Sequence, residues 1–106
     1  PHWGRKMPTA LWIAHVHVTD AEAYGRYAAL ATGAIAQHGG KFIARASRYV
    51  TLEGADRPRH VVAVFPSLEA GEACYRSPDY QAALEHARGA SVRDLMVVEL
   101  LEDATL

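Results

Sequence analysis

His15 and His17 lie two residues apart in the apolar segment 13–18, IAHVHV. On a strand, two such imidazoles share one face, with Cβ atoms about 6.5 to 7 Å apart. They could chelate a metal ion if a neighbouring strand supplied a third ligand, for which Glu99 is the candidate. They could instead respond to pH, because histidine titrates near neutrality. The commoner alternative is a pair of hydrogen-bonded side chains in a wet cavity. Because His-x-His alone is a weak metal signal, we predict no metal and no other cofactor.

Arg45 is a second candidate. Its guanidinium suits a carboxylate, which it can hold through paired hydrogen bonds. It could equally pair with Glu99 or with an acidic residue of another subunit, because arginine is frequent at interfaces for structural reasons.

Glu53 and Arg57 lie with His60 around a loop marked by Gly54 and Pro58. Loops often carry function, although Glu53 and Gly54 could simply form a turn with Arg57 as the charge partner. No residue is assigned a catalytic role. The candidate ligand-binding residues are therefore His15, His17, Arg45, Glu99, Glu53 and Arg57.

The remaining reactive side chains are expected to pack in the interior. Helical tyrosines more often fill a core than act as acids, and a lone cysteine such as Cys74 behaves as a small hydrophobe. The tyrosines concerned are Tyr24, Tyr27, Tyr75 and Tyr80.

The sequence pattern predicts the elements that position these residues. Residues 10–18, 41–50, 60–65 and 94–101 are rich in β-branched, aromatic or other apolar residues and read as strands. A helix follows the first strand, with Thr19 as its cap and Glu22 completing a capping box, and His38 with two glycines ends it. Ser67 and Ser77 are expected to cap two shorter helices before the last strand.

This order, β-α-β-β-α-β, is typical of an α+β, ferredoxin-like fold. Right-handed crossovers give a four-stranded antiparallel sheet in the order 4-1-3-2, with the helices on one face. Alternation places Trp12 and Val16 toward the helices and the imidazoles of His15 and His17, with Arg45 and Glu99, on the bare face. The apolar residues assigned to the bare face are Leu11, Ile13, Ile43, Tyr49, Leu95 and Val97. So much apolar surface favours a homodimer with facing sheets, and the space between two such sheets is a normal place for a small-molecule pocket.

Composition limits the possible partners and location. The chain has 106 residues, 11 of them basic and 12 acidic. We expect residues 10–106 to form one domain and residues 1–9, which precede or flank a possible natural start at Met7, to be a disordered or non-native tail. The charge balance argues against nucleic acid, and no apolar run is long enough to cross a membrane. A single cysteine suits a reducing compartment, so we expect a soluble, cytoplasmic protein.

Several segments resemble one known family. The chain reads WIAHVHVTDAEAYGRY, GGKFIARASRYVTLEG, HVVAVFPSLEAGEACYRSPDYQ and DLMVVEL, and residues 10–101 as a whole are similar to the domain-of-unknown-function family 1330 (DUF1330). That family belongs to the dimeric α+β barrel superfamily. The resemblance implies a ferredoxin-like subunit in a homodimer with facing sheets and implies no particular reaction. One difference is that His15 and His17 replace an Arg and Asp that the family pattern commonly carries.

Two functional hypotheses follow. The favoured one is an uncharacterised dimer with a small-molecule pocket near the sheet interface or between sheet and helices. The alternative is a small enzyme, monooxygenase- or isomerase-like, in which His15, His17 and Arg45 would serve as acid-base and anchoring groups.

Overall fold

Strand β1 (Ala10–Val18) lies inside a four-stranded antiparallel sheet with the order β2-β3-β1-β4. The computed structural model describes residues 9–104, so the predicted tail falls outside the described residues except for Thr9. The other strands are β2 (Lys41–Arg45), β3 (Arg59–Phe65) and β4 (Ser91–Glu99). Read from the other edge, the order is the predicted 4-1-3-2, which confirms the ferredoxin-like arrangement.

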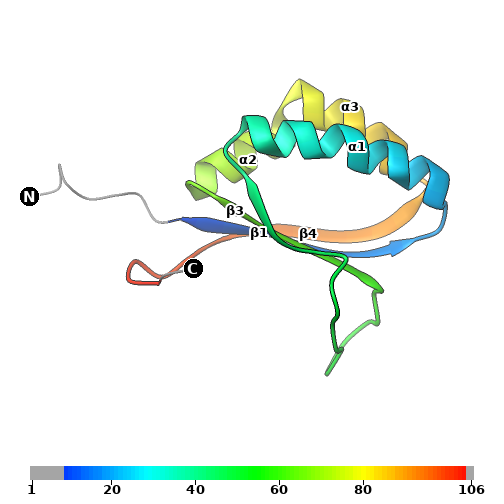
Figure 1. Cartoon of the computed structure of the whole chain (residues 1–106), viewed down its shortest axis with the longest axis horizontal. Coiled ribbons are helices and arrows are strands. Elements are labelled where there is room, and N and C mark those ends of the chain that lie inside the picture. The colour runs from blue at the N-terminus through cyan, green and yellow to red at the C-terminus, as the bar shows by residue number, and fades with distance from the viewer. Residues whose placement is uncertain (1–8, 105–106) are drawn as a thin grey trace, which may run out of the picture.

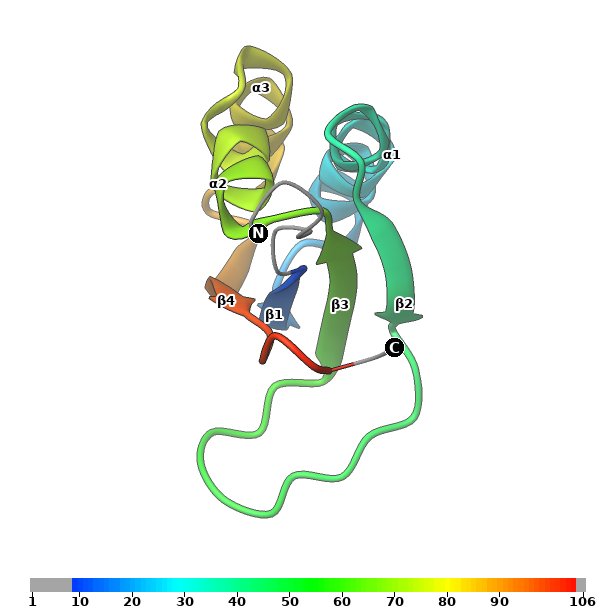
Figure 2. The same ribbon diagram turned by 90° about the vertical axis from the view of Figure 1, so that its left-hand side faces the viewer.

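Three helices cover one face of the sheet (Figure 1): α1 (Ala21–Gln37), α2 (Leu68–Arg76) and α3 (Pro78–Ala87). No helix in the described part of the chain is long and apolar enough to cross a bilayer. Within residues 9–104 the opposite face of the sheet carries no helix. The loop between β2 and β3 extends on that side and curls under the sheet toward β4 (Figure 2).

The helix ends follow from local hydrogen bonding. Asp20, and not the predicted Thr19, caps α1, because its side chain accepts a hydrogen bond from the backbone N–H of Ala23 at 3.2 Å. Helix α1 ends at His38, and Gly39 follows with a φ of 82°, as the sequence predicted. Ser67 and Ser77 accept hydrogen bonds from the first turns of α2 and α3, which confirms both predicted caps.

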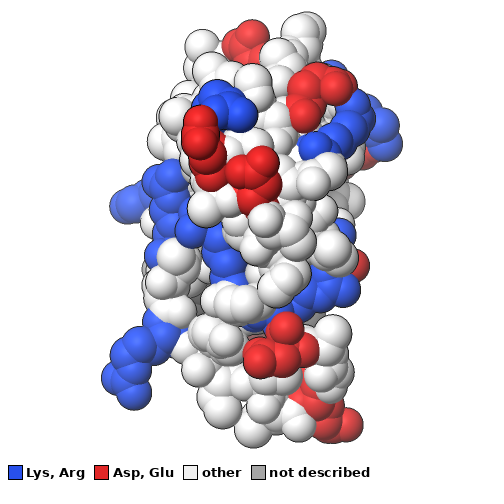
Figure 3. Space-filling view, turned by 90° about the vertical axis from the view of Figure 1, so that its right-hand side faces the viewer, with Lys and Arg blue, Asp and Glu red and all other residues white. Residues whose placement is uncertain are grey.

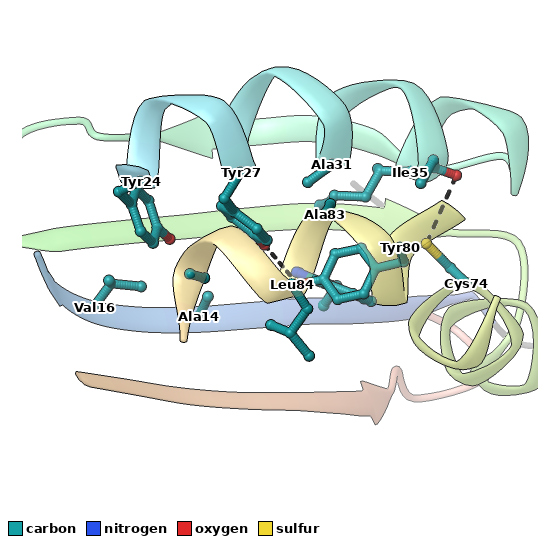
Figure 4. Packing of buried hydrophobic residues seen from close by; sticks show 14 of the residues in the cluster. Ala14, Val16, Tyr24, Tyr27, Ala31, Ile35, Cys74, Tyr80, Ala83 and Leu84 are labelled. Atoms are coloured by element: carbon teal, nitrogen blue, oxygen red, sulfur yellow. Dashed lines mark hydrogen bonds between the residues drawn. The ribbon is translucent and has the colours of Figure 1, made fainter. Parts of the chain in front are cut away.

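The core lies between the sheet and the helices. Trp12 is 1% exposed and packs on Phe65 and Tyr80, with ring centroids 5.5 and 5.2 Å apart. Figure 4 shows Tyr24 and Tyr27 of α1 pointing down onto β1, and Tyr80 of α3 meeting Tyr27. Cys74 is buried, as predicted. The aromatic side chains thus fill the layer that the sequence assigned to them.

A β-bulge shortens and rotates β2. Phe42 pairs with Ala63 but Ala44 pairs with Val62, so Ile43 is an extra residue in the ladder. The strand ends at Arg45, and Ala46 follows with a φ of 52°. The predicted strand 41–50 is therefore too long, and Tyr49 lies in the loop that follows it.

Candidate functional site

A row of polar side chains crosses the outer face of the sheet, which is the face without helices. His15 of β1 pairs with His60 of β3 on one side and with Asp94 of β4 on the other. The next rows on this face are apolar: Ile13 lies between Val62 and Met96, and Leu11 between Val64 and Val98. The polar row therefore lies at the end of the face from which the β2–β3 loop extends.

The two imidazoles make direct contact. Nδ1 of His15 and Nδ1 of His60 are 2.7 Å apart, and the rings meet edge to face. One Nδ1 must donate and the other must accept. In a neutral pair, the ring that accepts at Nδ1 carries its proton on Nε2, whereas the ring that donates at Nδ1 leaves Nε2 free to accept. The pair can thus offer one donor and one acceptor to a third molecule.

The loop completes this site. Arg57 reaches across to Asp94, with Nη2 of the guanidinium 3.1 Å from the carboxylate. Tyr49 stacks on His60 with ring centroids 4.5 Å apart. The resulting hollow has a volume of about 410 Å³, and its remaining lining residues are Val50, Thr51, Leu52, Glu53 and Ala55. We call this hollow the outer site.

Two buried polar atoms of the outer site have no hydrogen-bond partner among the described residues: Nε2 of His60 and Nη1 of Arg57. Burying such a group without a partner costs about 1–3 kcal/mol. Unpartnered groups of this kind are unusual in folded proteins. Both atoms belong to residues that line the hollow, which makes this hollow the candidate ligand-binding site of the outer face.

The structure brings three of the six candidate residues together. His15, Glu53 and Arg57 line the outer site. The ion pair of Arg57 with Asp94 replaces the expected pairing with Glu53, because no salt bridge joins Glu53 and Arg57 in the described chain. His17 is on the same face but is exposed and lies beyond the hollow.

Arg45 and Glu99 do not lie where alternation predicted. The bulge at Ile43 adds one residue, so Arg45 turns to the helix side, where its Nη2 donates a hydrogen bond to Thr32 Oγ1 of α1 at 2.9 Å. Glu99 pairs with the buried Ala10 at the far end of β4, so it is remote from His15 in register. It therefore cannot complete a chelate with His15 and His17. Within residues 9–104, no group of three or more His, Cys, Asp or Glu residues could hold a metal ion.

The face assignment of β4 was also wrong. Leu95 and Val97 pair with Ala14 and Trp12 and pack against the core, whereas Met96 and Val98 are on the outer face. The apolar residues alternate too weakly in this strand to show its parity. For the same reason Asp94 could not be assigned to the outer face from the sequence, and the contact of His60 with His15 emerges only from the register of β1 and β3.

The family comparison identifies a domain of unknown function. The model for DUF1330, "Domain of unknown function (DUF1330)", matches residues 9–101. No curated protein matches the chain significantly.

Solved structures of similar fold come from several bacteria. A protein of unknown function from Rhodopseudomonas palustris, RPA0582, has a TM-score of 0.73 and 22% identity, covering 94% of this chain and 88% of its own. SnoaB, a cofactor-independent oxygenase from Streptomyces nogalater, has a TM-score of 0.64 and 14% identity, with 93% and 97% covered. A dimeric protein of unknown function with a ferredoxin-like fold from Bacteroides fragilis has a TM-score of 0.61 and 11% identity, with 90% and 99% covered. At these identities the similarity concerns the fold.

Proposed function

The chain belongs to the DUF1330 family, and from this premise we propose that it is a homodimer that binds a small hydroxylated aromatic molecule in the outer site. The observation that carries the proposal is the His15–His60 pair, which lines a hollow and in which Nε2 of His60 is buried without a partner in the described chain, as is Nη1 of Arg57 in the same lining. The imidazole pair supplies one donor and one acceptor, as a phenol hydroxyl needs, while Val50 and Leu52 supply apolar contacts.

The outer face supports the dimer. It carries exposed apolar side chains: Ile43, Met96 and Val98 are 50%, 53% and 44% exposed, and Val92, on the other side of Asp94 along β4, is 52% exposed. Val50 and Leu52 of the loop are 77% and 86% exposed. An apolar surface of this extent is typical of an interface, and a two-fold dimer would bury the same patch twice. The structure of similar fold from Bacteroides fragilis is of a dimeric protein, which supports a dimer here as well.

The dimer is tested with two separate variants, one that adds a charge to the outer face of the sheet and one that adds a charge to the helix side. Met96 on the sheet and Leu30 on α1 are 53% and 50% exposed. We expect wild type and Leu30→Glu to sediment as dimers and Met96→Glu to sediment as a monomer in analytical ultracentrifugation. A monomeric wild type at micromolar concentration, or a Met96→Glu dimer as stable as wild type, would refute the proposed interface.

Ligand binding is tested by a thermal-shift screen with phenol, catechol and hydroquinone. Compounds that raise the Tm of wild type should lose that effect in His60→Ala, which removes both the pair and the unpartnered Nε2. His17→Ala, a change on the same face outside the hollow, should retain it. If no phenol shifts the Tm of wild type, or His60→Ala responds as wild type does, the proposed ligand class is wrong.

A second candidate function is oxygenase-type chemistry without a cofactor. It is favoured by the fold similarity to SnoaB and by an imidazole pair able to take a proton from a bound phenol. Oxygen consumption with the same phenols tests it. Uptake by wild type that His15→Ala abolishes would favour an enzyme, whereas binding without uptake would favour a binding protein.

A further inference from the structure

Three arginines lie together on the helix side of the sheet. Arg59 of β3 and Arg93 of β4 both pair with Val16, so they flank this residue in one row across the sheet. Arg45 pairs with Val61 and is therefore the diagonal neighbour of Arg59 on the next strand. All three side chains line a cavity between the sheet and α1.

None of these guanidinium groups has an acidic partner within residues 9–104. In this part of the chain, none of the salt bridges involves Arg45, Arg59 or Arg93. The arginines that do pair with carboxylates are Arg26, Arg57, Arg76 and Arg88. Three like charges gathered beneath a helix are unfavourable unless a counter-charge is present.

Aromatic rings and hydroxyl groups hold the three arginines in place instead. Arg45, Arg59 and Arg93 stack on Phe42, Tyr24 and Tyr27, with the guanidinium carbon 4.5, 5.5 and 4.6 Å from the ring centroids. Such contacts orient a cation without neutralising it. Nη2 of Arg93 also donates to the hydroxyls of Tyr27 and Tyr80, at 2.7 and 3.1 Å. Two further donors, Nε of Arg59 and Nε of Arg93, are buried without a partner in the described chain.

The cavity is small and continues into a larger hollow. The lining of the inner part includes the three arginines and Thr32 among mainly aromatic and aliphatic side chains, and this part measures about 30 Å³. This is space for roughly two water molecules or one carboxylate group. Tyr24, Ala28 and Arg59 line both this part and an open hollow of about 410 Å³ at the start of α1. The hollow is mainly apolar, and its other lining residues are Val18, Ala21, Gly25, Ala46 and Pro58. Figure 3 shows basic side chains in a band across the middle of this end of the molecule.

We propose that the cluster of Arg45, Arg59 and Arg93 binds the carboxylate of a small organic acid whose apolar body lies in the adjoining hollow. Guanidinium groups recognise carboxylates through paired, charge-assisted hydrogen bonds. An inner part of only about 30 Å³ favours a carboxylate over the larger phosphate group. This site is on the opposite face of the sheet from the outer site, so it does not rest on the function proposed above.

The proposal is tested by titration calorimetry at low salt with benzoate, hexanoate and inorganic phosphate. Benzamide, which has a similar shape to benzoate but no charge, is the control ligand. We expect the two carboxylates to bind wild type and benzamide not to bind. Arg59→Gln should weaken benzoate binding at least tenfold, and Arg45→Gln should also weaken it. Arg76→Gln, which changes an exposed arginine of α2, should bind as wild type does. Circular dichroism confirms that each variant is folded; if Arg59→Gln is not, Arg45→Gln and Arg59→Lys carry the test.

The outcomes separate this site from the outer site. His60→Ala should bind benzoate unchanged, and benzoate should shift the NMR signals of Ala28 and Val61, which line the inner cavity. The proposal is overturned if neither carboxylate binds at 10-fold molar excess over a millimolar protein solution, if benzamide binds as tightly as benzoate, or if phosphate binds more tightly than both. It is also overturned if His60→Ala abolishes benzoate binding while both folded arginine variants still bind benzoate.

Discussion

Nδ1 of His15 lies 2.7 Å from Nδ1 of His60, although the two residues are 45 positions apart in the chain. The contact crosses β1 and β3 at a position where the outer face changes from apolar to polar. It needs one proton between the two nitrogens, because two protonated imidazoles have no acceptor. The pair is therefore both a structural link between neighbouring strands and the part of the outer site that can exchange a proton.

A double-mutant cycle should detect this link. His15→Ala and His60→Ala, alone and together, are compared by urea unfolding. We expect a coupling free energy of about 0.5–1.5 kcal/mol, the usual net contribution of one hydrogen bond. The cycle of His17→Ala with His60→Ala should give about zero within the error of such cycles. Equal coupling in both cycles would mean that the contact contributes nothing specific.

Gly40 and Gly33 should respond in opposite directions to alanine. A Cβ at Gly40 would lie 2.5 Å from Ile35 Cγ2 and 2.7 Å from Phe65 Cζ, whereas one at Gly33 meets no atom within 4 Å. We expect Gly40→Ala to lower the free energy of unfolding by about 1–3 kcal/mol through overpacking. Gly33→Ala should raise it by up to about 1 kcal/mol, because alanine favours a helix interior. A Gly40→Ala protein as stable as wild type would show that the junction of α1 and β2 is looser than described.

Alternation along a strand was a sound guide only where the strand is regular and its two faces differ. In β1 the helix side is wholly apolar and the outer side carries imidazoles, so both faces were identified correctly. In β2 the extra residue Ile43 reverses the face of the sheet on which each later side chain of the strand lies, and no turn residue in the sequence marks the bulge. In β4 both faces are apolar over Leu95–Val98, so the sequence contains no information on parity.

The candidate site was limited by the same causes. His15 was found because it breaks an apolar run, and Arg57 because it lies in a loop. Asp94 was missed because cross-strand register is decided by packing of the whole sheet and not by local sequence. The arginine cluster was missed because the bulge moves Arg45 to its face and because Arg59 and Arg93 look like ordinary exposed charges in the sequence.

Cys74 should be nearly inert in the folded protein. Burial raises the pKa of its thiol to about 11, from an ordinary value of 9.0. At pH 8 the reactive thiolate is then about 100-fold rarer than in the unfolded chain. Iodoacetamide should alkylate the native protein at least about 100-fold more slowly than protein in concentrated urea. Similar rates in the two states would place the thiol at the surface.

Alkaline pH should destabilise the protein through the buried tyrosine pair. The hydroxyls of Tyr27 and Tyr80 are 2.5 Å apart, and burial raises the pKa of both phenols above the ordinary value. Above about pH 10 the unfolded chain therefore loses protons that the native state keeps, and the free energy of unfolding falls as pH rises.

The variant Tyr27→Phe removes one of these two phenols. Its free energy of unfolding should therefore fall less steeply between pH 10 and pH 11.5 than that of wild type. A shift of one pKa unit is worth about 1.4 kcal/mol. Both proteins keep Cys74, so its contribution to the pH dependence cancels. Urea unfolding across this range measures the slopes, and absorbance near 295 nm follows phenol ionisation. If Tyr27 and Tyr80 of the native protein ionised near pH 10, before unfolding, the buried pair could not be the source of the pH dependence.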